Sequence, residues 1–467
     1  MSLPHILIFI ALAFFPGKWL KGSARQFFLL VLSVLAIYLL QPALPIRGLD
    51  FYLPTLTLGL VILSWRLVTP TEQVPWRSQW RTLGILLVVP LLLAATRYLP
   101  WPLPLTPSLP PLPLYVLLLL LLLFAVSTGV PRWRHGVIFG IGLLLLFFLL
   151  LKTPALTRLL SQGLRWLTAQ DMTRAAATDI RWLGFSFIAF RLIHTLRDCQ
   201  MGRLPGTSLA EYVTYVLFFP ALTAGPIDRL ERFLQDLRRP FTLQSADVLA
   251  AGMRLSLGLL KKFVLADTLA LIALNDLNAW ELRSSLWSWG VLYAYSWQIY
   301  WDFSGYTDIA IGLGRLFGIQ LPENFNRPYQ MPNLTQFWNN WHMTLTQWFR
   351  AYFFNPLTRS LRRKGLAVTW LILVTQLSTM LLIGLWHGVT WNFILWGIWH
   401  GVGLFVHNRW SEWVRPRWQI APRWQPWWNA AGAVLSFHYV TLGWVFFALS
   451  SPQAAWRVFS VLFGGAG

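Results

Sequence analysis

The chain has 467 residues, of which 56% are hydrophobic and only 12% charged, and its mean hydropathy is +0.52. A typical soluble domain carries roughly 25% charged residues, so this composition excludes an ordinary soluble protein. The net charge of +21 would indicate nucleic-acid binding in a soluble protein. In a membrane protein, basic loops report orientation instead, and we expect no nucleic-acid partner.

Apolar runs long enough to cross a bilayer recur along the whole chain. A spanning helix needs about 20 mostly apolar residues, and shorter or interrupted runs accompany the full-length ones. The pattern predicts an all-α polytopic membrane protein with about 11 to 13 membrane helices or re-entrant elements. The candidate segments are Pro4–Phe15, Gln26–Leu44, Phe51–Val68, Leu83–Tyr98, Leu112–Val130, Val137–Leu151, 183–197, 209–226, 248–271, 284–303, 366–386, 389–407 and 430–449.

Basic residues alternate between successive loops of the first part of the chain. They follow the first, third and fifth segments, whereas the loop Pro100–Pro113 has none. The positive-inside rule then predicts an extracytoplasmic N-terminus. The basic segment 152–182 breaks the alternation and is interpreted as an amphipathic interfacial helix or a re-entrant piece. The cations in the predicted cytoplasmic loops are Lys18, Lys21, Arg25, Arg77, Arg81, Arg132 and Arg134.

Two parts of the chain differ in how often polar residues interrupt the apolar runs. Residues 1–180 are leucine-rich and contain almost no polar residue inside an apolar run, so we expect N-terminal transmembrane helices without a functional motif. In residues 181–467 the apolar runs are interrupted by glycine, proline, histidine, aspartate, asparagine and tryptophan. Polar groups at membrane depth are costly unless they face a cavity or one another, so this part is predicted to be the functional core.

The lone Cys199 excludes an internal disulfide and a multi-cysteine metal site, and we expect no metal. It follows His194 and Asp198, a spacing that some soluble acyltransferases use for catalysis. On a helix, residues four apart also pair without catalysis. We favour this structural interpretation of His194 and Asp198.

The first two interrupted segments indicate a broken helix and a basic cluster. Phe-Pro and Gly-Pro steps interrupt the apolar run of 212–229, which predicts a re-entrant element followed by an amphipathic helix over 228–239. Lys261 and Lys262, followed by Asp267, could bind an anionic donor. A positive-inside anchor at a helix end is the favoured alternative.

The third segment places two carboxylates near the end of an apolar run. Asp302 and Asp308 flank Tyr306, and Arg327 follows in the stretch Leu-Pro-Glu-Asn-Phe-Asn-Arg-Pro. Paired acids can orient a histidine or serve as a base. They can equally cap helices and pair with an arginine such as Arg327, and for Asp308 this structural role is favoured.

Two histidines are the candidate catalysts. His342 is centred in an aromatic segment that ends at Arg350, and His387 follows Trp386 between two long apolar runs. Histidine titrates near neutral pH and can accept a hydroxyl proton and return one to a leaving thiol. Nearby glycines permit close backbone approach, and tryptophans can form the walls of a site. The role of His400 remains open. The other histidines are interpreted as structural, namely His5, His135, His407 and His438.

These segments together resemble the membrane-bound O-acyltransferase family. Gly-Leu-Trp-His-Gly-x-x-Trp-Asn-Phe-x-x-Trp-Gly and Asp-Phe-Ser-Gly-Tyr-x-Asp are specific in combination. The similarity runs from about Gly184 to Phe447, and it is strongest to the bacterial branch of alginate O-acetylases and teichoic-acid D-alanyl transferases. Asn339 and Asn340 depart from the family's frequent basic residues, and Ala351 replaces a common acid.

The resemblance implies a central funnel or tunnel in the bacterial inner membrane, with His387 essential and His342 a second functional histidine. It implies an acyl thioester donor such as acetyl-CoA or an acyl carrier, with no bound cofactor. The acceptor would be a hydroxyl of an extracytoplasmic polysaccharide or of an esterase-like partner protein. D-alanyl transfer from a carrier protein remains an alternative, as does a transporter or lipid flippase without covalent chemistry. The supporting or tunnel-lining candidates are Trp386, Asn392, Trp391, Asp308, Asp302, Tyr306, Trp341 and Arg350, and the weaker donor-binding candidates are Lys261, Lys262 and Arg327.

Overall fold

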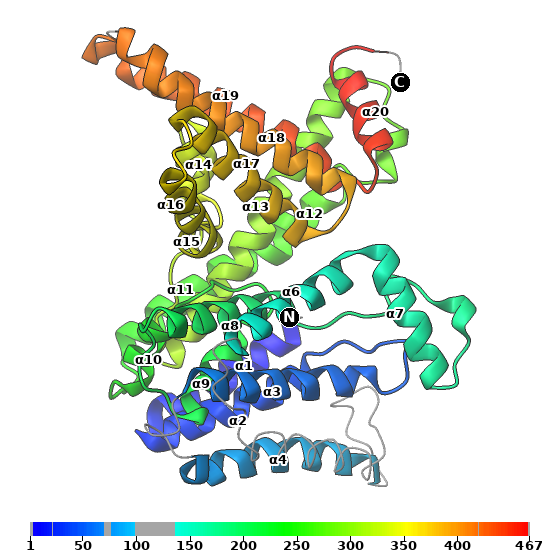
Figure 1. Cartoon of the computed structure of the whole chain (residues 1–467), viewed down its shortest axis with the longest axis vertical. Coiled ribbons are helices and arrows are strands. Elements are labelled where there is room, and N and C mark those ends of the chain that lie inside the picture. The colour runs from blue at the N-terminus through cyan, green and yellow to red at the C-terminus, as the bar shows by residue number, and fades with distance from the viewer. Residues whose placement is uncertain (1–2, 21, 70–75, 99–135, 419, 466–467) are drawn as a thin grey trace. The chain divides into compact units, whose positions relative to one another are not determined.

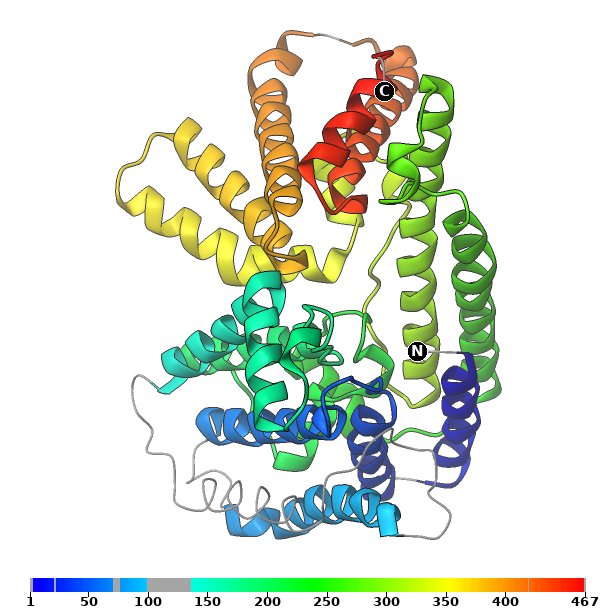
Figure 2. The ribbon, with the colours of Figure 1, turned by 90° about the vertical axis from the view of Figure 1, so that its right-hand side faces the viewer.

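The computed structural model describes residues 3–20, 22–69, 76–98, 136–418 and 420–465, and Figures 1 and 2 show it from two sides. These residues form helices joined by turns and loops, and none of them forms a strand. The predicted all-α fold is therefore confirmed. The predicted span Leu112–Val130, the proline-rich loop Pro100–Pro113, and His135, Arg132 and Arg134 lie outside the described residues.

Among the described residues, three helical stretches are long and apolar enough to cross a membrane. They are α3 (Leu49–Val68), α17 (Val368–His387) and Pro422–Ala448, which contains α19 (Gln425–Ala448). A fourth span is possible if α6 (Gly136–Lys152) and α7 (Pro154–Leu167) form one broken crossing, because a bend of 93° separates them. Shorter apolar helices lie at Leu3–Phe14, Ser23–Leu39, Trp80–Ala95 and Leu209–Ala221.

The chain divides into two compact units. Residues 1–254 and 310–321 form the first unit, and residues 255–309 and 322–467 form the second. Their boundaries fall inside α11 (Ser245–Leu259), inside α13 (Ser285–Leu316) and after residue 321, whereas the composition of the sequence changes near residue 180. The position at which polar residues become frequent therefore differs from the positions at which the compact units divide.

The first unit contains the helices drawn in blue to green in Figure 1. Between α9 (Leu209–Val216) and the short η4 (Phe219–Ala221), the sequence Phe-Phe-Pro breaks the helical hydrogen bonds, as predicted. The buried Arg191 of α8 (Phe185–Gln200) donates to the carbonyls of Tyr215, Val216 and Ala221. This cation satisfies carbonyls that the broken helix leaves without intrahelical partners. The remaining helices described in this unit are α1 (Leu3–Trp19), α2 (Ser23–Leu39), α4 (Trp80–Ala95) and α10 (Leu230–Arg238).

The segment after α6 is amphipathic, as the spacing of its leucines predicts. In α7, Leu159, Trp166 and Leu167 are exposed. On the other face, Arg165 forms a buried ion pair with Asp179 at 2.9 Å, and Ser161 donates to the same carboxylate. An apolar face without a protein partner is typical of a helix that lies in the membrane interface.

The second unit is built around a helical hairpin of α17 and α18 (Trp391–Arg409), against which α19 also packs. Glycines line the contact between the two arms of the hairpin. A Cβ atom added to Gly397 would lie 2.8 Å from Cα of Leu381, and one added to Gly401 would lie 2.9 Å from Cα of Leu377. Only residues without a side chain permit so close an approach of the two backbones. The unit ends with α20 (Pro452–Leu462).

A second glycine contact places α13 against the chain that precedes it. The π-helical segment η5 (Leu260–Ala266) follows α11, and a Cβ atom on Gly258 would lie 2.7 Å from the carbonyl oxygen of Gly305. The same approach brings the lysines of η5 next to the carboxylates of α13, as described below. Single π-helical turns often mark functional positions in helices.

Candidate functional site

His387 lies at the turn of the α17–α18 hairpin. It is the last residue of α17, and Gly388 follows it in extended conformation. Thr390 then caps α18, because its hydroxyl accepts from the backbone N–H of Phe393. The motif Trp-His-Gly-x-x-Trp-Asn therefore ends one helix and starts the next, which fixes the half-buried His387 at the hairpin's tip.

Aromatic rings surround His387. Its ring centroid lies 4.4 Å from that of Trp386, 4.6 Å from Phe447 and 5.8 Å from Trp396. Phe393 stacks against it at 5.7 Å. A wall of rings excludes water and strengthens the electrostatic interactions of whatever polar group it encloses.

His342 connects two short helices, α14 (Leu334–Asn340) and α15 (Met343–Phe349). Its φ of 42° is in the left-handed region, which is uncommon for a residue with a side chain and is often found at functional sites. The residue is only 3% exposed. The backbone strain and the burial together show that the surrounding structure imposes this position on His342.

Asn324 determines which nitrogen of His342 carries the proton. The side-chain oxygen of Asn324 accepts from the backbone N–H and from the hydroxyl of Thr344, at 3.2 and 2.9 Å. These contacts assign that atom as oxygen, so Nδ1 of His342, at 3.1 Å, must be the donor. In the neutral ring, Nε2 is then an acceptor. It is buried and has no hydrogen-bond partner.

Burial also keeps the ring of His342 neutral. The residue lies outside the helices that are long enough to span a membrane, and desolvation lowers its pKa to about 3. At physiological pH the imidazole therefore has one lone pair, on Nε2, directed away from Asn324. Such a nitrogen can accept a hydrogen bond from a hydroxyl group.

The two candidate histidines share Trp386 as a neighbour. The ring of His342 lies 6.2 Å from the ring of Trp386, which is itself 4.4 Å from His387. Phe303, in the motif Asp-Phe-Ser-Gly-Tyr of α13, contacts His342 edge to face at 4.6 Å. Three segments that are separate in the sequence thus contribute to one aromatic cluster that contains both histidines.

His400 is a third buried histidine in the same unit. It is fully buried, and neither ring nitrogen has a hydrogen-bond partner. Its ring lies 4.8 Å from Trp396 and 5.1 Å from Trp338, whose indole N–H groups also have no partner. Such orphaned polar groups are the usual binding sites of buried water or of a ligand.

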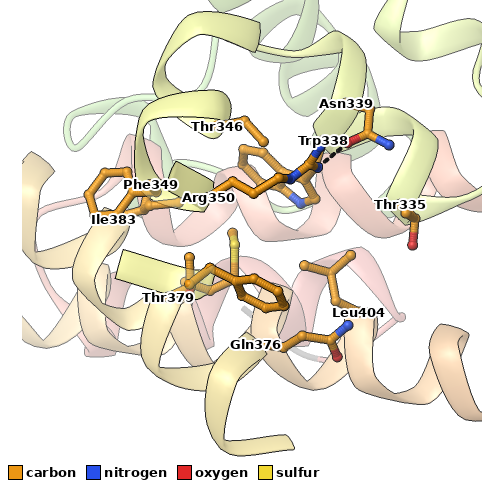
Figure 3. A pocket seen from close by; sticks show the side chains of 12 residues that line it. Thr335, Trp338, Asn339, Thr346, Phe349, Arg350, Gln376, Thr379, Ile383 and Leu404 are labelled. Carbon is orange, nitrogen blue, oxygen red and sulfur yellow. Dashed lines mark hydrogen bonds between the residues drawn. The ribbon is translucent and has the colours of Figure 1, made fainter. Parts of the chain in front are cut away.

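A cavity of about 190 Å³ lies beside this cluster (Figure 3). Trp338 is one of its walls, and the guanidinium of Arg350 crosses its edge to reach the side-chain oxygen of Asn339 at 2.5 Å. The buried side-chain oxygen of Gln376 has no partner. The cavity therefore combines one cation, unpaired polar atoms and an apolar floor, to which Ile383, one turn before His387, contributes.

The predicted supporting residues lie in different surroundings. Trp341 is buried among aromatic rings that include Tyr329 and Trp444. The amide nitrogen of Asn392 donates to the carbonyl of Leu449 at 2.6 Å and so connects α18 to the end of α19. Trp391 is 70% exposed, and it does not join the cluster around His387.

The predicted basic and acidic candidates neutralise one another. Lys261 pairs with the buried Asp308 at 2.6 Å, and Lys262 pairs with Asp302 at 2.5 Å and with Asp267 at 3.0 Å. These ion pairs agree with the structural role favoured for Asp308, and each of the two lysines has a carboxylate partner. Tyr306 is buried on the same helix, and Arg327 is exposed at a left-handed turn with φ of 45°.

In the first unit, His194 and Asp198 form the pair that their spacing of four residues predicts. Nδ1 of the histidine lies 3.0 Å from Asp198, and its Nε2 accepts from the backbone N–H of Leu230. The thiol of Cys199 contacts the carbonyl of Val68. Within the described part of the chain, no group of three or more histidine, cysteine, aspartate or glutamate side chains could hold a metal ion.

Sequence reasoning did not single out Asn324, Thr344 or Phe303, which orient or contact His342. Asn324 and Phe303 belong to the motifs Leu-Pro-Glu-Asn-Phe-Asn-Arg-Pro and Asp-Phe-Ser-Gly-Tyr. Membership in these motifs was the only sequence signal that pointed to them. Their individual roles depend on which atoms meet after folding. The sequence does not contain that information in a local pattern.

Comparison with known proteins matches the chain to a family of membrane-bound enzymes. The model described as MBOAT, membrane-bound O-acyltransferase family, matches residues 143–451. A probable alginate O-acetylase of Azotobacter vinelandii is 36% identical over 60% of this chain and 53% of the relative. The teichoic acid D-alanyltransferase of Bacillus subtilis is 31% identical over 58% and 69%, and the peptidoglycan O-acetyltransferase of Helicobacter pylori is 34% identical over 54% and 46%. The chain thus spans about half the length of the alginate-type relative.

Proposed function

Since the chain belongs to the membrane-bound O-acyltransferase family, we propose that it transfers an acyl group, acetyl in the first instance, from a cytoplasmic thioester to an extracytoplasmic hydroxyl. The acceptor is a polysaccharide or a partner protein, and the protein resides in a bacterial inner membrane with its N-terminus outside. The observation that carries this proposal is that His387 and His342 both neighbour Trp386, with an accepting nitrogen on His342. Relatives named as O-acetylases and O-acetyltransferases support acetyl as the group.

In the proposed reaction, His387 acts as the general base. It takes the proton of the attacking hydroxyl as the oxygen forms a bond to the thioester carbonyl carbon. When the C–S bond breaks, the same proton passes to the leaving thiolate, so atoms and charges balance. Base catalysis of this kind contributes about 10²- to 10⁴-fold, and holding both substrates together contributes a further large part.

The tautomer of His342 narrows its role. In acyl transfer, this residue could hydrogen-bond either the thioester carbonyl or the acceptor. Because Nε2 is an acceptor in the neutral ring, it cannot donate to a carbonyl oxygen. We therefore assign His342 to the acceptor, where it receives a hydrogen bond from a hydroxyl group next to the reacting one and positions the substrate.

The developing oxyanion needs a hydrogen-bond donor. The side-chain amide of Asn392 already donates to Leu449, so it is a weaker candidate than the indole groups. Trp396 lies beside His387, and its buried N–H has no partner. We propose Trp396 as the donor, because an N–H already fixed in a dry site stabilises the oxyanion without reorganisation.

The test uses inverted membrane vesicles that contain the protein. Radiolabelled acetyl-CoA is supplied from outside, which is the cytoplasmic face, and alkali-labile label is counted in the macromolecules inside. Wild type should accumulate ester-bound label, and His387→Ala should reduce the rate by about 10²- to 10⁴-fold. The control is His438→Gln, whose wild-type ring bonds Tyr293 and Val434 instead. Equal labelling by His387→Ala at equal protein abundance would exclude the mechanism.

Two rival functions are separated in the same vesicles. The similarity to a teichoic acid D-alanyltransferase makes D-alanyl transfer the second candidate, and a D-alanyl thioester of a carrier protein would then label the acceptor when acetyl-CoA does not. A flippase or transporter would leave no covalent label from either donor. Covalent label from acetyl-CoA alone supports the proposal.

A further inference from the structure

The second unit contains a larger groove that plays no part in the proposed chemistry. It has a volume of about 640 Å³, within the roughly 300–1,000 Å³ typical of small-molecule sites. Its walls are the C-terminal half of α18, the N-terminal half of α19 and the segment 332–336. The lining is mostly apolar and aromatic, with Val402, Val406 and Leu435 among its residues. This mostly apolar lining suits a hydrocarbon chain.

Two glycines give the groove its shape. A Cβ atom on Gly403 would overlap the hydroxyl of Tyr439, and one on Gly432 would overlap the carbonyl oxygen of Pro332. All four residues line the groove. The first contact holds α18 against the Tyr439 side chain of α19, and the second holds α19 against the backbone of segment 332–336.

One end of the groove carries a positive charge without a protein counter-charge. Arg415 lines the groove and is exposed, and within the described ranges no carboxylate pairs with it. Arg409, by contrast, pairs with Glu412 at 2.5 Å. Segment 409–423 has four arginines and a single acid, so its field attracts anions.

Exposed tryptophans lie along the same segment of the chain as Arg415. Trp410, Trp413, Trp418 and Trp424 are 40 to 55% exposed. They lie where α18 ends and where the candidate span Pro422–Ala448 begins. Tryptophan accumulates at the headgroup level of membranes, and basic residues accumulate on the cytoplasmic side. The charged end of the groove is therefore at the level of lipid phosphates.

We propose that this groove is a binding site for an anionic phospholipid, with an acyl chain between α18 and α19 and the headgroup phosphate on Arg415. A zwitterionic lipid would bring a second cation toward a segment that already has excess positive charge, and this repulsion favours a lipid with net negative charge. The site is separate from the residues assigned to acyl transfer. It therefore stands independently of the proposed function.

The experiment measures lipid retention. Protein purified in detergent and stripped of lipid is incubated with equimolar phosphatidylglycerol and phosphatidylcholine, and bound lipid is counted by native mass spectrometry. Wild type should retain one phosphatidylglycerol in clear preference. Arg415→Gln should lose most of this preference and Arg415→Lys should keep part of it. Arg417→Gln, a change in the same segment at a residue that does not line the groove, should behave as wild type.

A second variant tests the apolar part of the site without disturbing the core. Leu435 lines the groove and is 72% exposed, so Leu435→Trp should fill the groove, leave folding intact and lower retention of both lipids. Equal retention of the two lipids by wild type would overturn the proposal. The same conclusion follows if Arg415→Gln and Leu435→Trp both retain phosphatidylglycerol like wild type, because the lipid would then bind elsewhere.

Discussion

At the scale of single residues, the site depends on one amide. The side-chain oxygen of Asn324 accepts two hydrogen bonds from Thr344. Because an amide oxygen can only accept, the contact of this atom with Nδ1 of His342 is a third hydrogen bond, donated by His342. The histidines themselves were predictable, because their motifs are local. The orientation of His342 was not, since it results from a contact across 18 residues that only the folded chain creates.

Replacing this amide should therefore impair His342 without removing it. Asn324→Ala leaves Nδ1 without its partner, and we expect the acyl-transfer rate to fall about 10- to 100-fold, as for other groups that orient a histidine. Measurement of kcat and KM for the acceptor in vesicles checks this. Asn340→Ala, at a half-buried residue whose side chain donates to the carbonyl of Gln336, is the control, and an equal loss there would contradict a specific role for Asn324.

The same measurement distinguishes two roles of His342. If this residue positions the acceptor, His342→Gln should raise KM for the acceptor more than it lowers kcat. His387→Ala should lower kcat mainly, because it removes the base. A full loss of kcat in His342→Gln with an unchanged KM would identify His342 as the base in place of His387.

At the scale of elements, glycine contacts fix where the site's helices lie. The helical runs and the broken segment around Phe219-Pro220 could be predicted from hydrophobicity and proline. The approach of η5 to α13 could not, because it depends on Gly258 meeting Gly305 in space. This contact explains why Lys261 and Lys262 lie next to Asp308 and Asp302 and form ion pairs with them.

The hairpin offers a test of this packing. Gly397→Ala would place a methyl group against the backbone of Leu381, and overpacking of this kind costs about 1–3 kcal/mol. We expect a lower Tm in detergent and reduced activity, since α17 carries His387. Gly252→Ala, where nothing lies within 4 Å of the added methyl, should leave Tm unchanged or raise it, because alanine stabilises a helix relative to glycine. Similar losses in both variants would argue against the hairpin contact.

The broken segment of the first unit offers another test. Arg191→Leu removes the donor for three carbonyls, and each buried group left unsatisfied costs about 1–3 kcal/mol. We expect little folded protein by size-exclusion fluorescence in detergent. Arg197→Leu, at a residue further along α8 that bonds only Gln200, should yield normal amounts. A normal yield of the Arg191 variant would show that water, and not this cation, satisfies the break.

At the scale of the whole molecule, the charges of the loops predict which side of the membrane each loop faces. After Cys199→Ser, an introduced cysteine is the sole thiol. With the N-terminus outside, Ala43→Cys after α2 should react with a membrane-impermeant maleimide in intact cells. Ser78→Cys, which is exposed after α3, should react only after permeabilisation. The reverse pattern would invert the assignment of donor and acceptor sides.

The length of α17 has a consequence for how far the acyl group travels. Its 20 residues span about 30 Å, the thickness of the hydrocarbon layer. The helix begins after a run of four basic residues, Arg359, Arg362, Arg363 and Lys364, which the positive-inside rule assigns to the cytoplasm. His387, at the other end, then belongs near the outer surface. Under the proposed function, the acceptor would dock near the outer membrane surface, and the acyl-carrying arm of the donor would extend through almost the full thickness of the hydrocarbon layer.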